Sequence, residues 1–437
     1  MATTKKKEVT VDADALNEEQ KAASKSINDM LRNFISANSD IEPDTEEKPE
    51  LLPTGMPTLD VVLGGGVIMG GFIQLYGRPG CGKSSFAIKI MSAFQKAFNY
   101  NCASIYIDAE TAMTNIRLKQ LGVRNVLLYN QCTLESVFDI IKNNIKFKQD
   151  NPKLAEVPFI IIWDSIPTTI SEKETGIEDP KQVVGYRANL LKTYLYQVKA
   201  DLRKYRITLI AINQTRDSIN MGFTPAETQI KGIKQADHIP GGKALLYATD
   251  QMLQMHDTAD LVEEKTGFNG KEIMIKAIKN KAFAPGIECK TAFSFVGGYS
   301  GFWSAFFTLA SEGLLSTTAG FYQMAGYENK FRAKAALELY KKDEKFKNAF
   351  NAAIRTFGER IVNQYKQQQE LVNSENVFEE NGGSNVNIMV DDSYDNASAG
   401  VPKAIGRKPV KGKKAVVEPE PMPDIETEES QDVEDLV

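Results

Sequence analysis

Histidine and cysteine are scarce in this 437-residue chain, and their scarcity argues against several kinds of site. The two histidines, His238 and His256, are too few for a histidine-rich metal cluster, and they make a Ser–His triad a poor explanation of any activity. The cysteines show neither the pairing of a disulfide framework nor the spacing of metal ligands. They are Cys81, Cys102, Cys132 and Cys289. Isolated thiols of this kind are typical of a reducing compartment.

Long apolar runs are also absent. No stretch reaches the roughly 18 apolar residues that a membrane-spanning helix needs. The N-terminal sequence MATTKKKEVTVDAD has no apolar segment behind its lysines, so it does not resemble a secretory signal. The composition, 42% hydrophobic and 25% charged, is that of an ordinary globular protein. We therefore expect a cytoplasmic protein with no membrane partner.

Charge is distributed unevenly along the chain. Residues 1–50 hold 7 Lys/Arg and 12 Asp/Glu, and residues 415–437 hold 9 acidic residues and no basic one. The net charge of −5 therefore leaves +9 for residues 51–414. A basic body between acidic ends favours a polyanionic partner and a tail that competes for the same surface. Acidic tails that only aid solubility would explain the charges equally well.

The order of apolar segments predicts the fold class. Near the N-terminus, Ile27, Met30, Leu31, Phe34 and Ile35 form one apolar stripe of a helix expected over about residues 14–37. From residue 72 onward, the runs FIQLYG, ASIYIDAE, NVLLYN, PFIIIWDS and ITLIAINQ alternate with helical patterns, as in a parallel sheet covered by helices. The later runs EIMIKAIKN and CKTAFSFV suit antiparallel additions. ALLYATDQMLQM is predicted to be another buried strand.

The segment GRPGCGKSS, residues 77–85, matches the phosphate-binding pattern G-x-x-x-x-G-K-[ST]. It lies between an expected strand and an expected helix, which is the context that phosphate binding requires. Backbone N–H groups and the helix N-terminus would face the phosphates, Lys83 would neutralise the β/γ region, and Ser84 would bind Mg²⁺. The expected loop residues are Gly77, Arg78, Pro79, Gly80, Cys81, Gly82, Lys83, Ser84 and Ser85.

Carboxylates at two strand ends complete the expected site. Asp164, at the end of FIIIWD, would share Mg²⁺ with Ser84, although a lone aspartate there is also common as a helix N-cap. In IYIDAETA, either Asp108 or Glu110 could orient the attacking water, and the residues alone leave this choice open. Together these features predict ATP hydrolysis.

Several segments occur in an order that is specific as a set. They are LPTGMPTLDVVLGGGVIMGGFIQLYGRPGCGKSS, IDAETA followed by LKQLGV, FIIIWDS, AINQTR, GGKALLYATD and IKNKAFAP. The set resembles the RecA family of recombinases, and the chain is similar to phage recombinases of the UvsX type over about residues 51–367. The resemblance implies an α/β fold with a RecA-like P-loop ATPase core, whose mostly parallel central sheet is flanked by helices. An N-terminal helix would precede this core and a small C-terminal α/β domain would follow it.

The resemblance also implies roles for individual residues. Glu110 would be the catalytic carboxylate, and Gln214 would sense the γ-phosphate. Lys279 and Lys281, in the KNK segment, would reach the ATP of a neighbouring subunit, so that hydrolysis would require a filament. Without the resemblance, these two lysines would be interpreted as a solvated surface pair. Arg117 replaces a tyrosine that commonly stacks on adenine in the family, and a guanidinium plane can also stack on a base.

Two loops are expected to bind DNA. The first lies within residues 166–187, and the second is the unusually long segment 213–242. The second loop offers cations for phosphates and apolar groups that could insert between bases, although a surface insertion without function would also explain its length. The expected DNA-binding residues are Arg187, Arg216, Ile219, Met221, Phe223, Lys231, Lys234, Gly241 and Gly242.

The expected domains are an N-terminal segment (1–50), the ATPase core (51–298), a small DNA-gathering domain (299–367) and a disordered tail with an acidic end (368–437). We expect an ATP- and Mg²⁺-dependent protein that forms helical filaments on single-stranded DNA and exchanges strands with double-stranded DNA. A single-strand-binding protein and a loading mediator would be further partners, in the cytoplasm of a bacterial host if a phage encodes the chain. The alternatives are a hexameric helicase of the same fold and a regulatory or mediator ATPase.

Overall fold

The computed structural model describes residues 30, 49–130, 132–174, 180–214, 216–217, 237–238 and 242–378. The chain divides into two compact units, Met1–Asn373 and Ser374–Val437, and all features below except the end of the last helix belong to the first. Of the helix expected over residues 14–37, only Met30 is among the described residues, where it is helical and exposed. None of the described helices combines the length and the apolar surface required to cross a bilayer.

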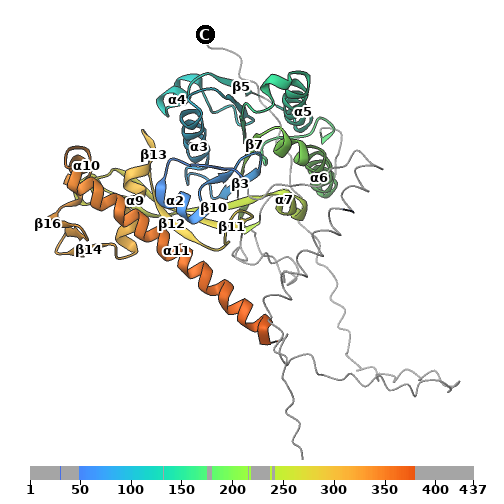
Figure 1. The fold of residues 1–437 in the computed structure, drawn as a ribbon. Helices are drawn as coiled ribbons and strands as arrows, with labels where there is room; N and C mark the ends of the chain where they lie inside the picture. The colour runs from blue at the N-terminus through green and yellow to red at the C-terminus, as the bar shows by residue number, and fades with distance from the viewer. Residues whose placement is uncertain are drawn as a thin grey trace, which may run out of the picture. The chain divides into compact units, whose positions relative to one another are not determined.

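A nine-stranded sheet forms the centre of the first unit, in the order β13-β12-β11-β10-β3-β7-β6-β4-β5 (Figure 1). The strands from β10 to β5 in this order run parallel to one another, and those from β10 to β13 run antiparallel. The parallel strands are β3 (Phe72–Gly77), β4 (Ala103–Asp108), β5 (Val126–Asn130), β6 (Phe159–Asp164), β7 (Ile207–Gln214) and β10 (Gln251–Leu261). The antiparallel additions are β11 (Gly270–Asn280), β12 (Glu288–Ser294) and β13 (Gly298–Ser300). This arrangement confirms the predicted fold class.

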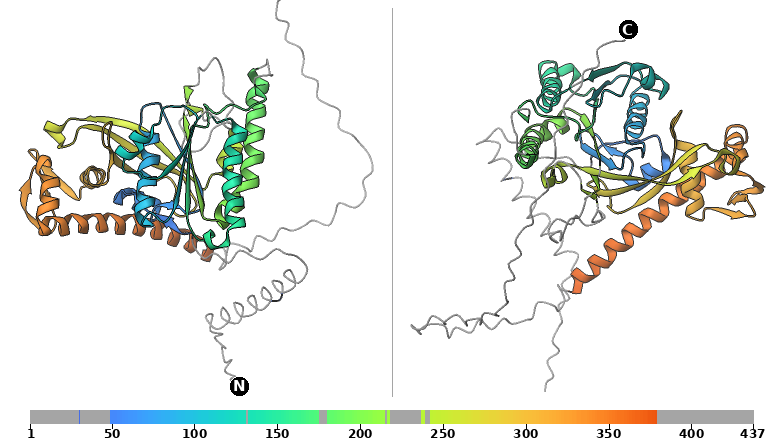
Figure 2. Two further views of the ribbon diagram at one scale, coloured as in Figure 1. Left: turned by 90° about the horizontal axis from the view of Figure 1, so that it is seen from above. Right: turned by 180° about the vertical axis from the view of Figure 1, so that it is seen from behind.

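The central strands β3, β6 and β7 are buried on both faces of the sheet, which explains why they are apolar without alternation. In β6, Ile160 and Ile162 pack into one hydrophobic core, while Ile161 and Trp163 pack into the other. Figure 2 (left) shows α3 on one side of the sheet and α5 and α6 on the other. The helices of the parallel part are α3 (Lys83–Ala97), α4 (Asn115–Gln120), α5 (Leu134–Asp150) and α6 (Pro180–Lys204). The Thr114 and Thr133 side chains cap α4 and α5 by accepting a backbone N–H in the first turn.

The long segment after β7 returns close to its starting point. The short strands β8 (Arg216–Asp217) and β9 (Asp237–His238) pair antiparallel, which brings the two ends of this segment side by side. Helix α7 (Gly242–Ala248) follows and leads into β10. The prediction of one continuous strand over ALLYATDQMLQM was therefore wrong, because its first part is helical. Leu245 and Ala248 are buried in the core shared with α6, and a short apolar run of this kind suits either a helix or a strand.

The C-terminal part of the first unit combines a small sheet with three helices. Strands β14, β15 and β16 form an antiparallel sheet of their own. Helix α11 buries Phe346, Phe350 and Phe357 and continues beyond the expected boundary at residue 367. The elements are α9 (Gly301–Ser311), β14 (Leu315–Thr318), β15 (Phe321–Met324), β16 (Tyr327–Phe331), α10 (Ala333–Lys342) and α11 (Glu344–Phe378). Smaller elements elsewhere are β1 (Leu51–Leu52), α2 (Pro57–Leu63), β2 (Val67–Ile68), η1 (Pro152–Leu154) and α8 (Glu263–Thr266).

Candidate nucleotide-binding site

The loop between β3 and α3 has the geometry of an anion-binding loop. Gly82 precedes the first residue of α3 with a φ of 79°, in the left-handed region that favours glycine. Lys83 is only 6% exposed, and its Nζ donates to the carbonyl oxygens of Gly77 (2.9 Å) and Arg78 (2.7 Å). The ammonium group is therefore held across the mouth of the loop, at the positive end of a helix.

Two glycines of this loop lie too close to other groups for a side chain. A Cβ added at Gly77 would lie 2.1 Å from the carbonyl oxygen of Met255 on the adjacent strand β10. A Cβ at Gly82 would lie 2.9 Å from the hydroxyl oxygen of Tyr299, which itself donates to the carbonyl oxygen of Cys81 at 3.3 Å. The loop is thus fixed from behind by β10 and β13.

Asp164 lies at the carboxyl end of β6, beside the start of α3. It is 6% exposed, and the Tyr106 hydroxyl donates to its Oδ2 at 2.6 Å. Burial raises the pKa of Asp164, and hydrogen bonds from Ser84 and Tyr106 partly offset this effect. Ser84 and Asp164 line the same pocket, and one carboxylate and one hydroxyl are hard oxygen ligands of the kind that bind Mg²⁺ together with phosphates. The donor set therefore fits a nucleotide-bound Mg²⁺.

Asp108 and Glu110 differ sharply in their surroundings. Asp108 is 1% exposed, and its Oδ2 accepts the backbone N–H of Met113 at 2.6 Å. Glu110 is exposed, and its Oε1 accepts from the Ser165 hydroxyl at 2.8 Å and from Gln214 Nε2 at 2.9 Å. Glu110 thus points toward the last residue of β7, while Asp108 holds the following turn.

These groups surround a pocket of about 290 Å³. Its lining residues are Pro79, Gly80, Gly82, Lys83, Ser84, Ser85, Glu110, Asp164, Ile212, Gln214, Phe293 and Phe295. The structure therefore brings together the predicted Lys83, Ser84, Glu110, Asp164 and Gln214. A cation, two carboxylates and an amide around one small cavity can bind a polyphosphate and orient a water molecule beside it.

Arg117 lies near the pocket but does not line it. Its guanidinium donates to the carbonyl oxygens of Phe295 (2.6 Å) and Val296 (3.0 Å), in the turn between β12 and β13. The N–H groups of Arg117 therefore hold this turn against α4. Phe295 is 59% exposed at the pocket edge, which is unusual for a large aromatic side chain.

The two lysines of the KNK segment lie near the start of β3 and β10, at the end of these strands that is far from the phosphate-binding loop. Asn280, between them, pairs with Gln251 at the start of β10, whereas Met255 further along β10 pairs with Gly77 of the phosphate-binding loop. The two ends of β3 lie roughly 17 Å apart, at 3.3 Å per residue. Lys279 and Lys281 therefore cannot reach the phosphate-binding loop of their own chain.

The expected DNA-binding residues are only partly described. Arg187, on α6, forms an ion pair with Glu174 and donates to the Pro167 carbonyl oxygen at 3.3 Å, so its guanidinium is engaged within the chain. Arg216 lies in β8, and Gly242 begins α7. The remaining expected residues lie outside the described residues: Ile219, Met221, Phe223, Lys231, Lys234 and Gly241.

Three residues of the site were not predicted from the sequence. Ser165 directly follows Asp164 in the WDS segment, and this adjacency was the available signal for its contact with Glu110. Tyr106 lies two residues before Asp108 on β4, so both side chains are on one strand. Phe295 carried no signal in the sequence, because only the fold brings the turn after β12 next to residues 77–85.

Comparison with known proteins is consistent with this geometry. A family model described as the RecA N-terminal domain matches residues 22–300, more than half of the chain. Proteins named "Protein RecA" are similar to the chain. The one from Fusobacterium nucleatum is 29% identical over 238 residues, covering 54% of this chain and 57% of that protein. Those from Mycoplasma mobile and Aquifex aeolicus are 30% and 28% identical, and the matches cover 70% and 73% of their lengths and 57% and 62% of this chain.

Proposed function

The chain belongs to the RecA family, and from this premise we propose that it is a DNA-dependent ATPase that forms helical filaments on single-stranded DNA. In these filaments it would pair homologous DNA and exchange strands. The chain spans little more than half the length of the Fusobacterium relative, so the activity of that whole protein enters here as a proposal. The kinship with phage recombinases of the UvsX type belongs to the same proposal and is supported by the ordered motifs.

The contact between Glu110 and Gln214 carries this proposal. Gln214 Nε2 donates to Glu110 Oε1 at 2.9 Å inside the phosphate pocket, and Gln214 is also the last residue of β7. Gln214 also lies at the start of the segment 213–242, which is expected to bind DNA. A nucleotide that changes the contacts of Gln214 would therefore act directly on the start of that segment. Such a link between the nucleotide pocket and the segment 213–242 is expected of an ATPase whose nucleotide controls the binding of a second ligand.

Each residue of the pocket has a role in this proposal. Lys83 stabilises the charge on the β- and γ-phosphates, and the loop residues Gly77, Arg78, Pro79, Gly80, Cys81, Gly82 and Ser85 surround the phosphate chain. Glu110 orients the attacking water, which the exposed position of its carboxylate supports. Ser84 and Asp164 would hold Mg²⁺, which supplies charge neutralisation between the phosphates when it is bound.

We propose that the base of the nucleotide stacks on Phe295 and not, as the resemblance implied, on Arg117. The N–H groups of Arg117 are engaged by the turn that carries Phe295, so Arg117 serves the nucleotide by holding that turn. Phe295, exposed at the edge of the pocket, offers an aromatic face on which a base can stack.

Assembly completes the site in this proposal. Lys279 and Lys281 lie at the end of the sheet far from the phosphate-binding loop of their own chain. In the filament they would act on the nucleotide of an adjacent subunit. The helix expected over residues 14–37 would contact that subunit. Residues 213–242 and 166–187 would bind single-stranded DNA, and the C-terminal region, with 10 Lys/Arg and 5 Asp/Glu over residues 328–367, would gather duplex DNA. A single-strand-binding protein and a loading mediator would assist in the cytoplasm.

A joint-molecule assay tests the proposal. Homologous circular single strands and linear duplex are mixed with the protein, with and without ATP, and the products are separated on a gel. Joint molecules that require both ATP and homology are expected, and Lys83→Ala should abolish them. DNA-stimulated ATP hydrolysis without joint molecules would instead support the regulatory ATPase. Strand displacement from a forked duplex without homologous pairing would support the helicase.

A further inference from the structure

A second pocket, of about 540 Å³, lies where β3 and β10 begin, at the end of these strands that is far from the phosphate-binding loop. Four of the described residues that line it are cations: Lys199, Arg203 and Lys204 from α6, and Lys281, which directly follows β11. Asp250 is the carboxylate among these lining residues. The remaining lining residues are Ile68, Gly70, Gly71, Tyr196 and Ala200. The pocket therefore has a positive potential that one internal negative charge partly cancels.

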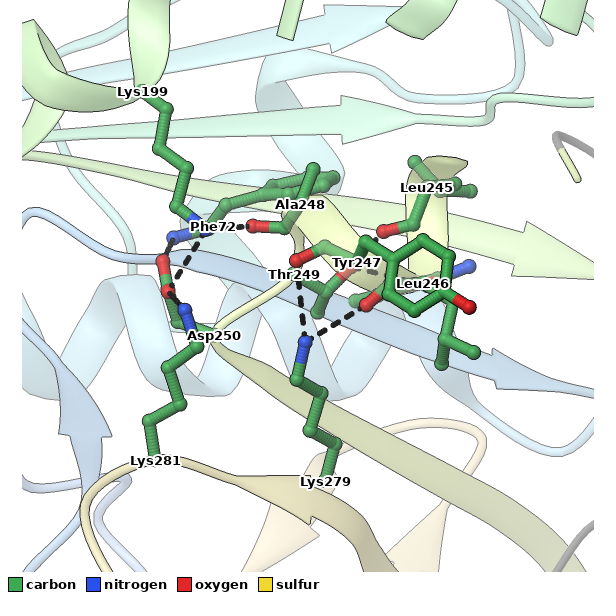
Figure 3. Close-up of polar contacts among 11 residues, drawn as sticks. Phe72, Lys199, Leu245, Leu246, Tyr247, Ala248, Thr249, Asp250, Lys279 and Lys281 are labelled. Carbon is green, nitrogen blue, oxygen red and sulfur yellow. Dashed lines mark hydrogen bonds and ion pairs between the residues drawn. The ribbon is translucent and has the colours of Figure 1, made fainter. Parts of the chain in front are cut away.

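Asp250 is held firmly by the start of β3 (Figure 3). Its Oδ2 accepts the backbone N–H of Phe72 at 3.0 Å, and its own backbone N–H donates to the Phe72 carbonyl oxygen at 2.8 Å. The side chain of Asp250 is 13% exposed. These bonds anchor the carboxylate through both its backbone and its side chain, so we expect the longer and more exposed lysines to be the groups that exchange partners.

The same carboxylate oxygen binds two lysines. Lys281 Nζ lies 2.7 Å from Asp250 Oδ1, and Lys199 Nζ lies 3.2 Å from it. Burial would raise the pKa of Asp250, but the hydrogen bonds from Lys281 and Phe72 outweigh it and hold that pKa below its usual value. Lys281 is nevertheless 48% exposed, so solvent and a competing anion have access to its ammonium group.

We propose that Asp250 is an internal counter-ion that binds Lys281 and Lys199 in the free protomer, and that these lysines leave it for an anionic ligand, the polyphosphate of a neighbouring subunit's nucleotide. The inference rests on the proposed function for the identity of that neighbour. In this proposal Asp250 has a positioning role. Lys199 joins Lys279 and Lys281 as a cation that acts on the nucleotide of the neighbouring subunit. The incoming phosphates must compete with Asp250 for the two lysines. The protomers would therefore assemble less readily than they would if the pocket held only its cations.

The first test measures DNA-stimulated ATP hydrolysis as a function of protein concentration. Asp250→Asn should lower the protein concentration at half-maximal activity by about tenfold, since the charge that competes with the incoming phosphates for Lys281 and Lys199 is removed. Asp250→Glu should restore a value near that of the wild type. Glu288→Gln is the matched control, because it removes the carboxylate of another lysine pair, with Lys276, and it should not produce this gain. A half-maximal concentration unchanged or raised in folded Asp250→Asn would overturn the inference.

The second test needs neither DNA nor assembly. In a Lys83→Ala background, whose own phosphate loop is impaired, binding of inorganic tripolyphosphate is measured by calorimetry. Adding Asp250→Asn should tighten this binding about tenfold, and adding Lys281→Ala as well should remove the gain. Equal affinities with and without Asp250 would refute the counter-ion role. Should Asp250→Asn fail to fold, Asp250→Ser provides the same comparison. Loss of strand exchange with a preserved tripolyphosphate gain would reject the proposed function alone.

Discussion

Asp60, a half-buried carboxylate in the first turn of α2, links stability to pH. Its Oδ1 accepts from the backbone N–H and from the hydroxyl of Thr54, both at 2.7 Å. Burial raises the pKa of Asp60 from 3.8 to about 6, although the Thr54 bonds and Lys89 act in the opposite direction. A raised pKa means that the folded chain binds this proton more tightly than the unfolded chain. Its contribution to stability is therefore present at low pH and is lost as the pH rises from about 4 to about 6.

Asp60→Asn is expected to remove this pH dependence. The amide oxygen can still accept from Thr54, and no charge is buried. The free energy of unfolding of the variant minus that of the wild type should increase between pH 4 and pH 7, by at most about 3 kcal/mol. Urea unfolding of both proteins at several pH values gives this difference directly. A difference that stays constant over this range would show that Asp60 does not titrate as described.

Phe295 is expected to contribute to nucleotide affinity through stacking. Phe295→Ala should weaken ATP binding by about tenfold or more, because base–aromatic stacking contributes about 1–3 kcal/mol. Val296→Ala is the matched control, since Val296 is 83% exposed in the same turn but is not one of the residues that line the pocket. Equilibrium binding of a fluorescent ATP analogue reports both affinities. Equal losses for the two variants would point to the turn as a whole and not to the ring of Phe295.

At the scale of elements, the close contact between β3 and β10 requires a glycine at residue 77, where the phosphate-binding loop begins. Gly77→Ala should destabilise the chain strongly, because its Cβ would lie 2.1 Å from the Met255 carbonyl oxygen and would separate the two strands. Gly80→Ala provides the comparison. Gly80 has a φ of +79° but no atom within 4 Å of its added Cβ, so its cost is the backbone strain of about 1–2 kcal/mol. Thermal unfolding should show a clearly larger loss for Gly77→Ala, and similar losses would contradict this account.

Elements differ in how well the sequence predicts them, for physical reasons. The parallel strands were predictable because burial on both faces makes them continuous apolar runs between helical patterns, as in β6 and β7. Helix α7 was mistaken for a strand because seven residues are too few to display a helical period. Lys83, Ser84 and Asp164 were predictable because local motifs carry their chemistry. The contacts of Arg117 with Phe295 and of Asp250 with Phe72 join residues almost 180 positions apart, so only the fold reveals them.

At the scale of the whole molecule, two candidate anion-binding sites lie at opposite ends of the parallel strands of the central sheet. The carboxyl ends of the parallel strands carry the pocket with Lys83 and Gln214, and the opposite ends carry Lys281 with its counter-ion Asp250. Both sites adjoin the segment 213–242, which is expected to bind DNA, because Gln214 lies at its start and Asp250 follows α7, which begins where the segment ends. Lys279 Nζ also donates to the carbonyl oxygens of Leu246 (2.9 Å) and Tyr247 (3.3 Å) at the end of α7. In the proposed filament, the residues at the two ends of this segment would therefore adjoin two different nucleotides.

The connection between Gln214 and that segment gives the last prediction. Gln214→Ala should leave ATP affinity largely intact, since Lys83 and the N–H groups of the phosphate-binding loop would make most of the contacts with the phosphates. It should, however, remove the difference in single-stranded DNA affinity measured with and without a non-hydrolysable ATP analogue. Phe223→Ala, in the expected DNA-binding segment, should weaken DNA binding in both nucleotide states. Fluorescence anisotropy of a labelled oligonucleotide separates these outcomes. If both variants behave alike, nucleotide sensing and DNA contact are not divided between Gln214 and the residues that follow it.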